Sequence, residues 1–191
     1  MQQQPDTSLY TASMAYTEET LHTFTAMQYN LFRKKQKYIA AGIAFILIVT
    51  GLVLGVTSWK GVLPLLIGCV VITNLLTVPK HIANRLLARF NGRLPSLNYR
   101  FHPDRMDVST SGVPVHYKSL LRMEDDKKYL YLFVSEENGY MIDKSSVEGE
   151  NGYAGLARLL ESQTGKTVHR YSSLFSVSLL SLLKDLRSGR S

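Results

Sequence analysis

The sequence predicts an α+β membrane protein, in which a transmembrane helical hairpin carries a small antiparallel β domain capped by a C-terminal helix. Three observations predict this class. Two uncharged apolar runs follow one another between residues 38 and 78, hydrophobic and polar residues alternate with a period of two after Pro95, and apolar residues recur at helical spacing after Asn151. The 191 residues suffice for one modest folded domain together with membrane segments.

The two apolar runs are Tyr38–Thr57 and Gly61–Val78. The first run covers about 30 Å at a rise of about 1.5 Å per residue, which is the thickness of a bilayer's hydrocarbon core. Only three residues separate the runs, among them Trp59 and Lys60, and Lys60 is the only charged residue between positions 39 and 78. Both side chains suit the headgroup region, so we expect this tripeptide to be an interfacial turn between two membrane spans.

The formal net charge of +7 is concentrated beside the apolar runs. The side that bears the two termini carries eight basic residues, against Lys60 alone at the turn: Arg33, Lys34, Lys35, Lys37, Lys80, Arg85, Arg89 and Arg93. The positive-inside rule therefore predicts a two-span protein of the cell membrane with both termini in the cytoplasm. Residues 96–165 carry eight basic and eleven acidic side chains, so we expect no nucleic-acid partner, because binding phosphate needs a basic face.

Small and polar residues inside the runs are the candidates for helix packing. Gly51 and Gly55 form a GxxxG pair, which favours either close packing within the hairpin or contact with a second copy. Asn74 is the only strongly polar side chain of the second run. Its amide fits a hydrogen bond to the partner helix, and a role in a transport pathway is the alternative.

A basic amphipathic helix is predicted directly after the second run, from Lys80 to Asn91. Lys80, Arg85, Arg89 and Arg93 are the candidate contacts for anionic lipid headgroups, each contributing about 1 kcal/mol close to a membrane surface. The same residues are also what topology determination alone requires. Both interpretations remain open at this stage.

The alternating pattern after Pro95 predicts six short strands joined by tight turns as an antiparallel meander. The segments are 97–101, 106–109, 113–117, 121–123, 129–135 and 140–143. A helix with Leu156 and Leu160 on one face should follow from about Asn151 and end at Gly165.

The N-terminal segment should join the same domain. Residues 9–16 alternate as a strand that we expect to pair with the sheet formed after the hairpin. Thr17 is placed to cap a helix that runs from Glu18 to about Lys37.

The chain resembles the YcxB-like family of bacterial membrane proteins over about residues 9–163. The residues that carry the resemblance are the HPDR turn at 102–105, the VPVHYKSL segment at 113–120, and the YLYLFV strand at 129–134 with Lys144 beyond it. The resemblance implies a pleckstrin-homology-like (PH-like) cytoplasmic domain, and it implies no catalytic residues. One position departs from the family pattern: Asp143 stands where proline often precedes the lysine.

No pattern of catalytic, cofactor-binding or metal-ligating residues is present, so we expect no enzyme and no cofactor. The five histidines are scattered. His102 and Asp104 share a turn, where an aspartate usually bonds to nearby backbone rather than acting in acid-base chemistry. The acidic cluster Glu124, Asp125 and Asp126 lacks the spacing of a calcium loop and is interpreted as a solvated turn.

Five segments summarise the expected organisation: residues 1–37, a cytoplasmic strand and helix; 38–78, the hairpin; 79–95, the basic membrane-proximal helix; 96–165, the cytoplasmic domain; and 166–191, an amphipathic basic tail. The tail either lies on the membrane or packs on the domain. The predicted function is a membrane-tethered binding or regulatory module whose partners are membrane lipids and a protein or a second copy of the chain. The alternative is an accessory or oligomeric subunit of a membrane transport complex.

Overall fold

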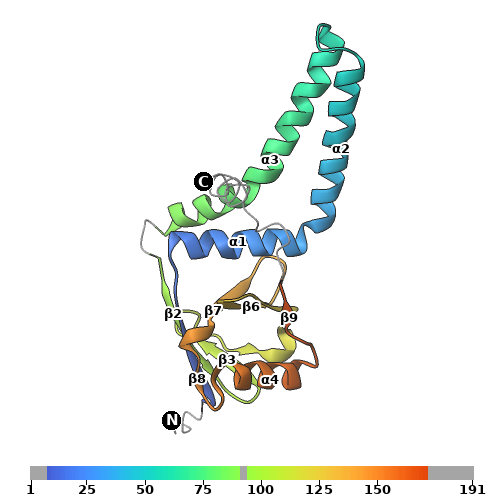
Figure 1. Cartoon of the computed structure of the whole chain (residues 1–191). Helices are drawn as coiled ribbons and strands as arrows, with labels where there is room; N and C mark the ends of the chain where they lie inside the picture. The colour runs from blue at the N-terminus through green and yellow to red at the C-terminus, as the bar shows by residue number, and fades with distance from the viewer. Residues whose placement is uncertain (1–7, 91–93, 172–191) are drawn as a thin grey trace, which may run out of the picture. The chain divides into compact units, whose positions relative to one another are not determined.

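The computed structural model describes residues 8–90 and 94–171. Within them the chain is α+β, as predicted, with four α-helices and two mainly antiparallel sheets (Figure 1). It divides into two compact units: a helical unit, Met14–Leu97, and a sheet unit, Met1–Ser13 with Asn98–Ser191. Arg93 and the greater part of the predicted basic tail lie outside the described residues.

The helical unit begins with α1, Glu18–Phe32, whose start matches the prediction. Thr17 caps it, because the Thr17 side chain accepts from the Thr20 N–H at 3.2 Å while the Thr17 N–H donates to the Thr20 hydroxyl at 2.7 Å. The predicted end at about Lys37 is wrong: α1 stops at Phe32, and α2 begins at Lys34. Neither glycine nor proline stands at this break, so the residue types there do not signal it.

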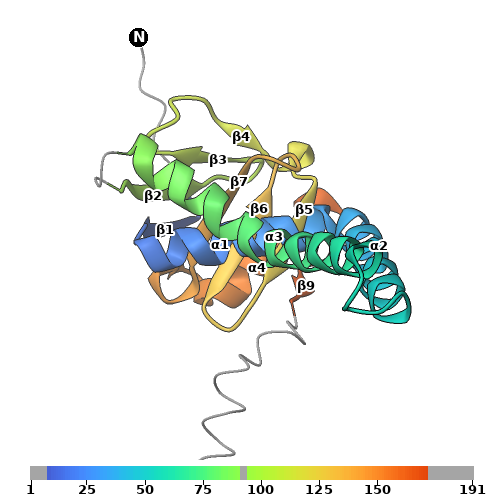
Figure 2. The ribbon, with the colours of Figure 1, turned by 90° about the horizontal axis from the view of Figure 1, so that it is seen from above.

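The hairpin consists of α2, Lys34–Val53, and α3, Trp59–Arg89, which lie side by side in Figures 1 and 2. The connection is Leu54–Ser58 and not the predicted tripeptide. Gly55 ends α2 with a φ of +86°, a left-handed conformation that glycine adopts without strain. Ser58 caps α3 by accepting from the Lys60 N–H at 3.2 Å, so Trp59 and Lys60 belong to the first turn of α3.

Helix α3 contains both the second apolar run and most of the predicted basic helix without interruption. Figure 1 shows a bend between its long straight part and its C-terminal part. We attribute the bend to Pro79, which lies inside the helix and removes one backbone hydrogen bond.

Nine strands within the described residues form two sheets. The first has the order β4-β3-β2-β1-β8: Val115–His116, Arg105–Val108, Ser96–Phe101, Tyr10–Ala15 and Glu148–Gly149. The second has the order β7-β6-β5-β9: Gly139–Asp143, Tyr129–Phe133, Arg122–Asp125 and His169–Arg170. The pairings of β1 with β8, β2 with β3, β3 with β4, β5 with β6 and β6 with β7 are antiparallel, and β5 pairs with β9 in parallel.

The six strands expected after Pro95 are all present, but the prediction of one meander is wrong. They form two meanders in separate sheets, β2-β3-β4 and β5-β6-β7. The division falls at a 3-10 turn, Tyr117–Ser119. The buried Tyr117 side chain fixes this turn by donating to the His102 carbonyl at 2.6 Å.

The predicted pairing of the N-terminal strand is confirmed. Strand β1 lies between β2 and β8, with Tyr10 opposite Gly149 and Thr11 opposite Glu148. The segments that precede and follow the hairpin in sequence therefore become neighbouring strands of one sheet.

Helix α4, Gly152–Thr164, ends at Gly165 with a φ of +66°, as expected. Leu156 and Leu160 are buried on its inner face. The largest fully buried side chains of the sheet unit come from both sheets and from the 3-10 turn between them: Tyr99, Phe101, Met106, Tyr117, Leu120, Met123, Leu130, Tyr131, Leu132, Phe133, Met141 and Ile142. The unit therefore has its own hydrophobic core.

Candidate functional site

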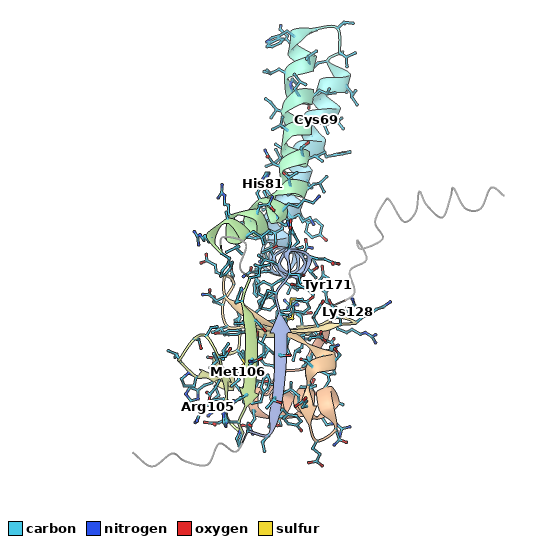
Figure 3. The ribbon with its side chains drawn as sticks, turned by 90° about the vertical axis from the view of Figure 1, so that its left-hand side faces the viewer. Cys69, His81, Arg105, Met106, Lys128 and Tyr171 are labelled. Carbon is cyan, nitrogen blue, oxygen red and sulfur yellow. The ribbon has the colours of Figure 1, made fainter. Side chains whose placement is uncertain are left out.

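The hairpin exposes an apolar surface along both of its helices. Helices α2 and α3 are long and apolar enough to cross a membrane, and only 11% of the apolar window of each is buried. A core helix of a soluble protein would be mostly buried. Figure 3 shows side chains projecting outward along the hairpin. The largest exposed ones include Ile39, Ile43, Phe45, Ile46, Val49, Leu52, Val53, Leu63, Leu66, Ile67, Val70 and Leu76.

Small residues hold the two helices together. A Cβ atom on Gly51 would stand 2.7 Å from the Gly61 carbonyl oxygen, so the two backbones touch at this point. Near the middle of the hairpin, a Cβ on Gly68 would stand 3.0 Å from the carbonyl oxygen of Ala44, which is fully buried. Close packing of small residues is typical of helices in a membrane, where the hydrophobic effect does not drive helices together.

The predicted GxxxG pair therefore does not form one helical face. Gly51 is buried against α3, while Gly55 lies beyond the end of α2 in the connection. The geometry favours the first of the two interpretations of Gly51, close packing within the hairpin. The sequence pattern did not single out Gly61 and Gly68, which supply the other half of this contact.

Asn74 is exposed on α3, and among the described residues its side chain makes no hydrogen bond. The expected hydrogen bond from Asn74 to the other helix of the hairpin is absent from this part of the chain. The neighbouring hydroxyls behave differently, because Thr73 donates to the Cys69 carbonyl at 2.9 Å and Thr77 to the Thr73 carbonyl at 2.9 Å. Asn74 is thus an unsatisfied amide within the apolar part of the helix.

The predicted headgroup contacts separate into two places on α3. Arg85 and Arg89 are four residues apart and share one exposed face, which continues the stripe begun by His81. Lys80 lies elsewhere on the helix, where it lines a groove with α1. The structure therefore brings Arg85 and Arg89 together and sets Lys80 apart.

The groove between α1 and α3 has a volume of about 600 Å³. Its charged lining comes from Glu18 and Glu19 on α1 and from Lys80 on α3. His22 also lines it, and its Nε2 lies 3.9 Å from a Glu18 carboxylate oxygen. The groove offers charges of both signs within the helical unit.

The sheet unit contains a polar cluster that the sequence analysis missed. Lys144 donates to the Asp125 carboxylate at 2.5 Å and to the Asp126 carbonyl at 2.5 Å, and its amine lies 4.3 Å from the centre of the Tyr153 ring. Tyr153 donates to the same Asp125 oxygen at 2.8 Å. The cluster ties β5, the turn after β7 and helix α4 to one another.

The interpretation of Glu124, Asp125 and Asp126 as a solvated turn is wrong. Glu124 lies in β5 with only 2% of its surface exposed, and its carboxylate accepts from the Arg122 Nε at 2.5 Å. Asp126 accepts from the Tyr131 hydroxyl at 2.7 Å and from backbone N–H groups of its own turn. These carboxylates satisfy the polar groups of a folded core.

Burial and nearby carboxylates raise the pKa of two tyrosines of the sheet unit, Tyr131 and Tyr153. Burial, together with the hydrogen bond to Asp126, raises the pKa of Tyr131 well above its ordinary value. Burial and the hydrogen bond to Asp125 raise the pKa of Tyr153 in the same way. These hydroxyls therefore remain protonated hydrogen-bond donors at neutral pH.

His102 is paired with Asp107 and not with Asp104, the aspartate that shares its turn. It is buried, and its Nε2 lies 3.1 Å from an Asp107 carboxylate oxygen across the β2-β3 hairpin. Asp104 instead lies 3.9 Å from the Nδ1 of His116. The hairpin twists the chain so that Asp107, five residues after His102, reaches the ring while Asp104 faces the next strand.

Neither the His102–Asp107 pair nor the His116–Asp104 pair is part of a metal site formed by the described residues. Within residues 8–90 and 94–171, no group of three histidine, cysteine, aspartate or glutamate side chains is arranged to hold a metal ion. A shallow cavity of about 410 Å³ lies between β4 and the β6-β7 turn and is lined by Val115, Ser119, Asn138 and Tyr140 among others. It contains no charged side chain.

No protein-family model matches the chain, and no curated protein or solved structure matches it significantly.

Proposed function

We propose that the chain is an integral membrane protein whose hairpin, α2 and α3, spans the bilayer. The observation that carries this proposal is the exposure of the apolar helices: only 11% of each apolar window is buried among the described residues. Soluble monomers rarely expose apolar patches beyond a few hundred Å², whereas a bilayer covers such a surface completely. Both segments are helical, so apart from the helix ends and the site of Pro79 their backbone groups bond within each helix, as a lipid environment requires.

The proposed orientation puts both termini in the cytoplasm. The exposed Lys34 and Lys35 lie at the start of α2, and Arg85 and Arg89 lie near the end of α3, whereas Lys60 alone stands at the connection. The proposal also assigns anionic lipid headgroups to the shared face of Arg85 and Arg89.

We further propose that the sheet unit is a binding or regulatory module tethered to the membrane by the hairpin, and not an enzyme. Its charged side chains with low exposure are paired within the unit: Lys144 is held by Asp125, and Glu124 by Arg122. Two antiparallel sheets followed by a helix are compatible with the PH-like domain that the YcxB-like resemblance implies.

A second candidate function, an accessory or oligomeric subunit of a membrane transport complex, is favoured by Asn74. An exposed amide within an apolar span is expected to bond to another chain in the membrane.

Single-cysteine labelling tests the proposed membrane topology. Cys69→Ser removes the only cysteine of the chain. In that background, Thr57→Cys places a thiol in the exposed connection of the hairpin, and Gln163→Cys places one on the exposed surface of α4. A membrane-impermeant maleimide applied to intact cells should label Thr57→Cys, and it should label Gln163→Cys only after permeabilisation.

The labelling is matched by an extraction experiment. The protein should stay in the membrane fraction after a wash with alkaline carbonate. Labelling of Gln163→Cys in intact cells would overturn the orientation, and release by carbonate would overturn membrane insertion itself.

A further inference from the structure

The starting point is the position of Asn74 on α3. Gly61 and Gly68 mark the side of α3 that contacts α2, and at 100° per residue Asn74 lies on the side away from α2. The surroundings of Asn74 on this outer side are apolar, with Val70 one turn before it and 58% exposed. If the hairpin spans the bilayer as proposed, an amide without hydrogen bonds faces hydrocarbon, which is strongly unfavourable.

Among the described residues, the hairpin provides no hydrogen-bond partner for the Asn74 side chain. The small-residue contacts at Gly51 and Gly68 join α2 to the opposite side of α3. Thr73 and Thr77 satisfy their hydroxyls on carbonyl groups of their own helix, whereas the Asn74 side chain does not. No described residue therefore supplies the partner of this amide, and a second molecule in the membrane can supply it.

We propose that α3 forms a two-fold symmetric contact with a second copy of the chain, centred on Asn74. A carboxamide is both donor and acceptor, so it is complementary to itself, and two copies satisfy each other through reciprocal N–H···O bonds. All copies share one orientation in a membrane, so a two-fold axis along the membrane normal places Asn74 opposite Asn74. Within one turn on either side of Asn74, α3 carries no charged side chain that would demand a partner of opposite charge.

This inference rests on the proposed membrane insertion and gives the module its oligomeric state. It differs from a GxxxG dimer, because Gly51 is already occupied within the hairpin and Gly55 lies outside the helix. Substituting Gly51 should therefore disturb the hairpin, while substituting Asn74 should act on self-association alone.

Disulfide cross-linking in native membranes tests which face of α3 meets the second copy. In the Cys69→Ser background, Val70→Cys places a thiol on the Asn74 face, and Leu76→Cys places one about 160° from Asn74 around the helix. The two positions are matched in exposure, at 58% and 67%. Mild oxidation should convert Val70→Cys into a covalent dimer and leave Leu76→Cys monomeric.

Self-association measured by energy transfer between labelled copies in lipid vesicles tests the amide itself. Asn74→Leu should weaken the dimer about tenfold, since an interhelical hydrogen bond in lipid contributes an affinity factor of this order. Asn74→Gln keeps a carboxamide and should retain most of the affinity.

Three results would overturn the inference: equal cross-linking of Leu76→Cys and Val70→Cys, unchanged self-association of Asn74→Leu, or cross-linking of Val70→Cys only to a different protein. A protein that resists carbonate extraction but stays monomeric would overturn the dimer and leave the membrane proposal intact. Release by carbonate would overturn the membrane proposal and the dimer together.

Discussion

Gly51 and Gly61 meet backbone to backbone, so closely that a Cβ atom on Gly51 would stand 2.7 Å from the Gly61 carbonyl oxygen. The Cβ and the backbone nitrogen of Leu65 lie within 2.9 Å of the same position. Because backbone atoms cannot rotate away as a flexible side chain can, any larger residue at Gly51 must push the two helices apart.

Gly51→Ala should therefore destabilise the hairpin by about 1 to 3 kcal/mol through overpacking. The measurement is a detergent-denaturation titration of the purified protein followed by helical circular dichroism. Gly42→Ala is the matched control, because Gly42 lies in the same helix and a Cβ there would meet nothing within 4 Å. Equal stability of the two variants would show that α2 and α3 do not touch at Gly51.

The course of the hairpin could be predicted from the sequence only in part. The two spans could be predicted because uncharged apolar runs long enough to cross a bilayer are typical of membrane helices. Hydropathy, however, is insensitive to where a helix stops. The glycine rule that correctly ended α4 at Gly165 also applies at Gly55, but the apolar residues around Gly55 concealed it.

Lys144→Met should destabilise the sheet unit by about 3 to 5 kcal/mol. The side chains of Lys144 and Asp125 are each only 16% exposed, so removing the amine leaves a poorly hydrated carboxylate without its counter-charge. Urea unfolding of the full chain in detergent, followed by tyrosine fluorescence, measures the loss.

Two further variants test the cause of that loss. Lys127→Met makes the same chemical change at an exposed lysine and should alter stability by no more than about 0.5 kcal/mol. Adding Asp125→Asn to Lys144→Met should recover part of the lost stability, because the unpaired charge is then gone. A double variant that loses the full sum of the two single changes would argue against the ion pair.

The sheet unit should lose stability as the pH rises above about 10. Burial raises the folded-state pKa of Tyr117 and Tyr131 above the ordinary value of about 10, and the carboxylates near each tyrosine raise it further. A raised folded-state pKa contributes stability that is present below the unfolded pKa and is lost as the pH climbs toward the folded one. The expected slope is about 1.4 kcal/mol per pH unit for each tyrosine.

Unfolding titrations at pH 8, 10 and 11 measure this loss, and absorbance near 295 nm reports tyrosinate. Tyr131→Phe should flatten the slope, because one titrating group is removed. The hydroxyls of Tyr117 and Tyr131 should ionise only together with unfolding. Ionisation of both near pH 10 in the folded protein would contradict the prediction.

The polar cluster around Lys144 could not have been predicted from the sequence. Lys144 and Tyr153 lie 19 and 28 positions from Asp125, and they are brought to it by the pairing of β5 with β6, the pairing of β6 with β7, and the docking of α4. The three consecutive acids were assigned to a turn because their charge was given more weight than their place beside a predicted strand. Met123 and Leu130 are buried beside them, so Glu124 and Asp125 could have been assigned to the strand that contains Met123.

Replacing Arg85 and Arg89 together by glutamine should reduce the stabilisation that the protein gains from anionic lipid. Both residues share an exposed face at the end of α3, and a cation close to an anionic surface contributes about 1 kcal/mol. We therefore expect the stability difference between phosphatidylglycerol and phosphatidylcholine nanodiscs to fall by about 2 kcal/mol, measured by thermal unfolding at low salt. The double lysine variant should keep the difference, because a diffuse field requires charge and not a guanidinium, and raised salt should abolish it through screening. If the glutamine variant keeps the full stability difference, Arg85 and Arg89 do not bind anionic lipid and serve only to determine the topology.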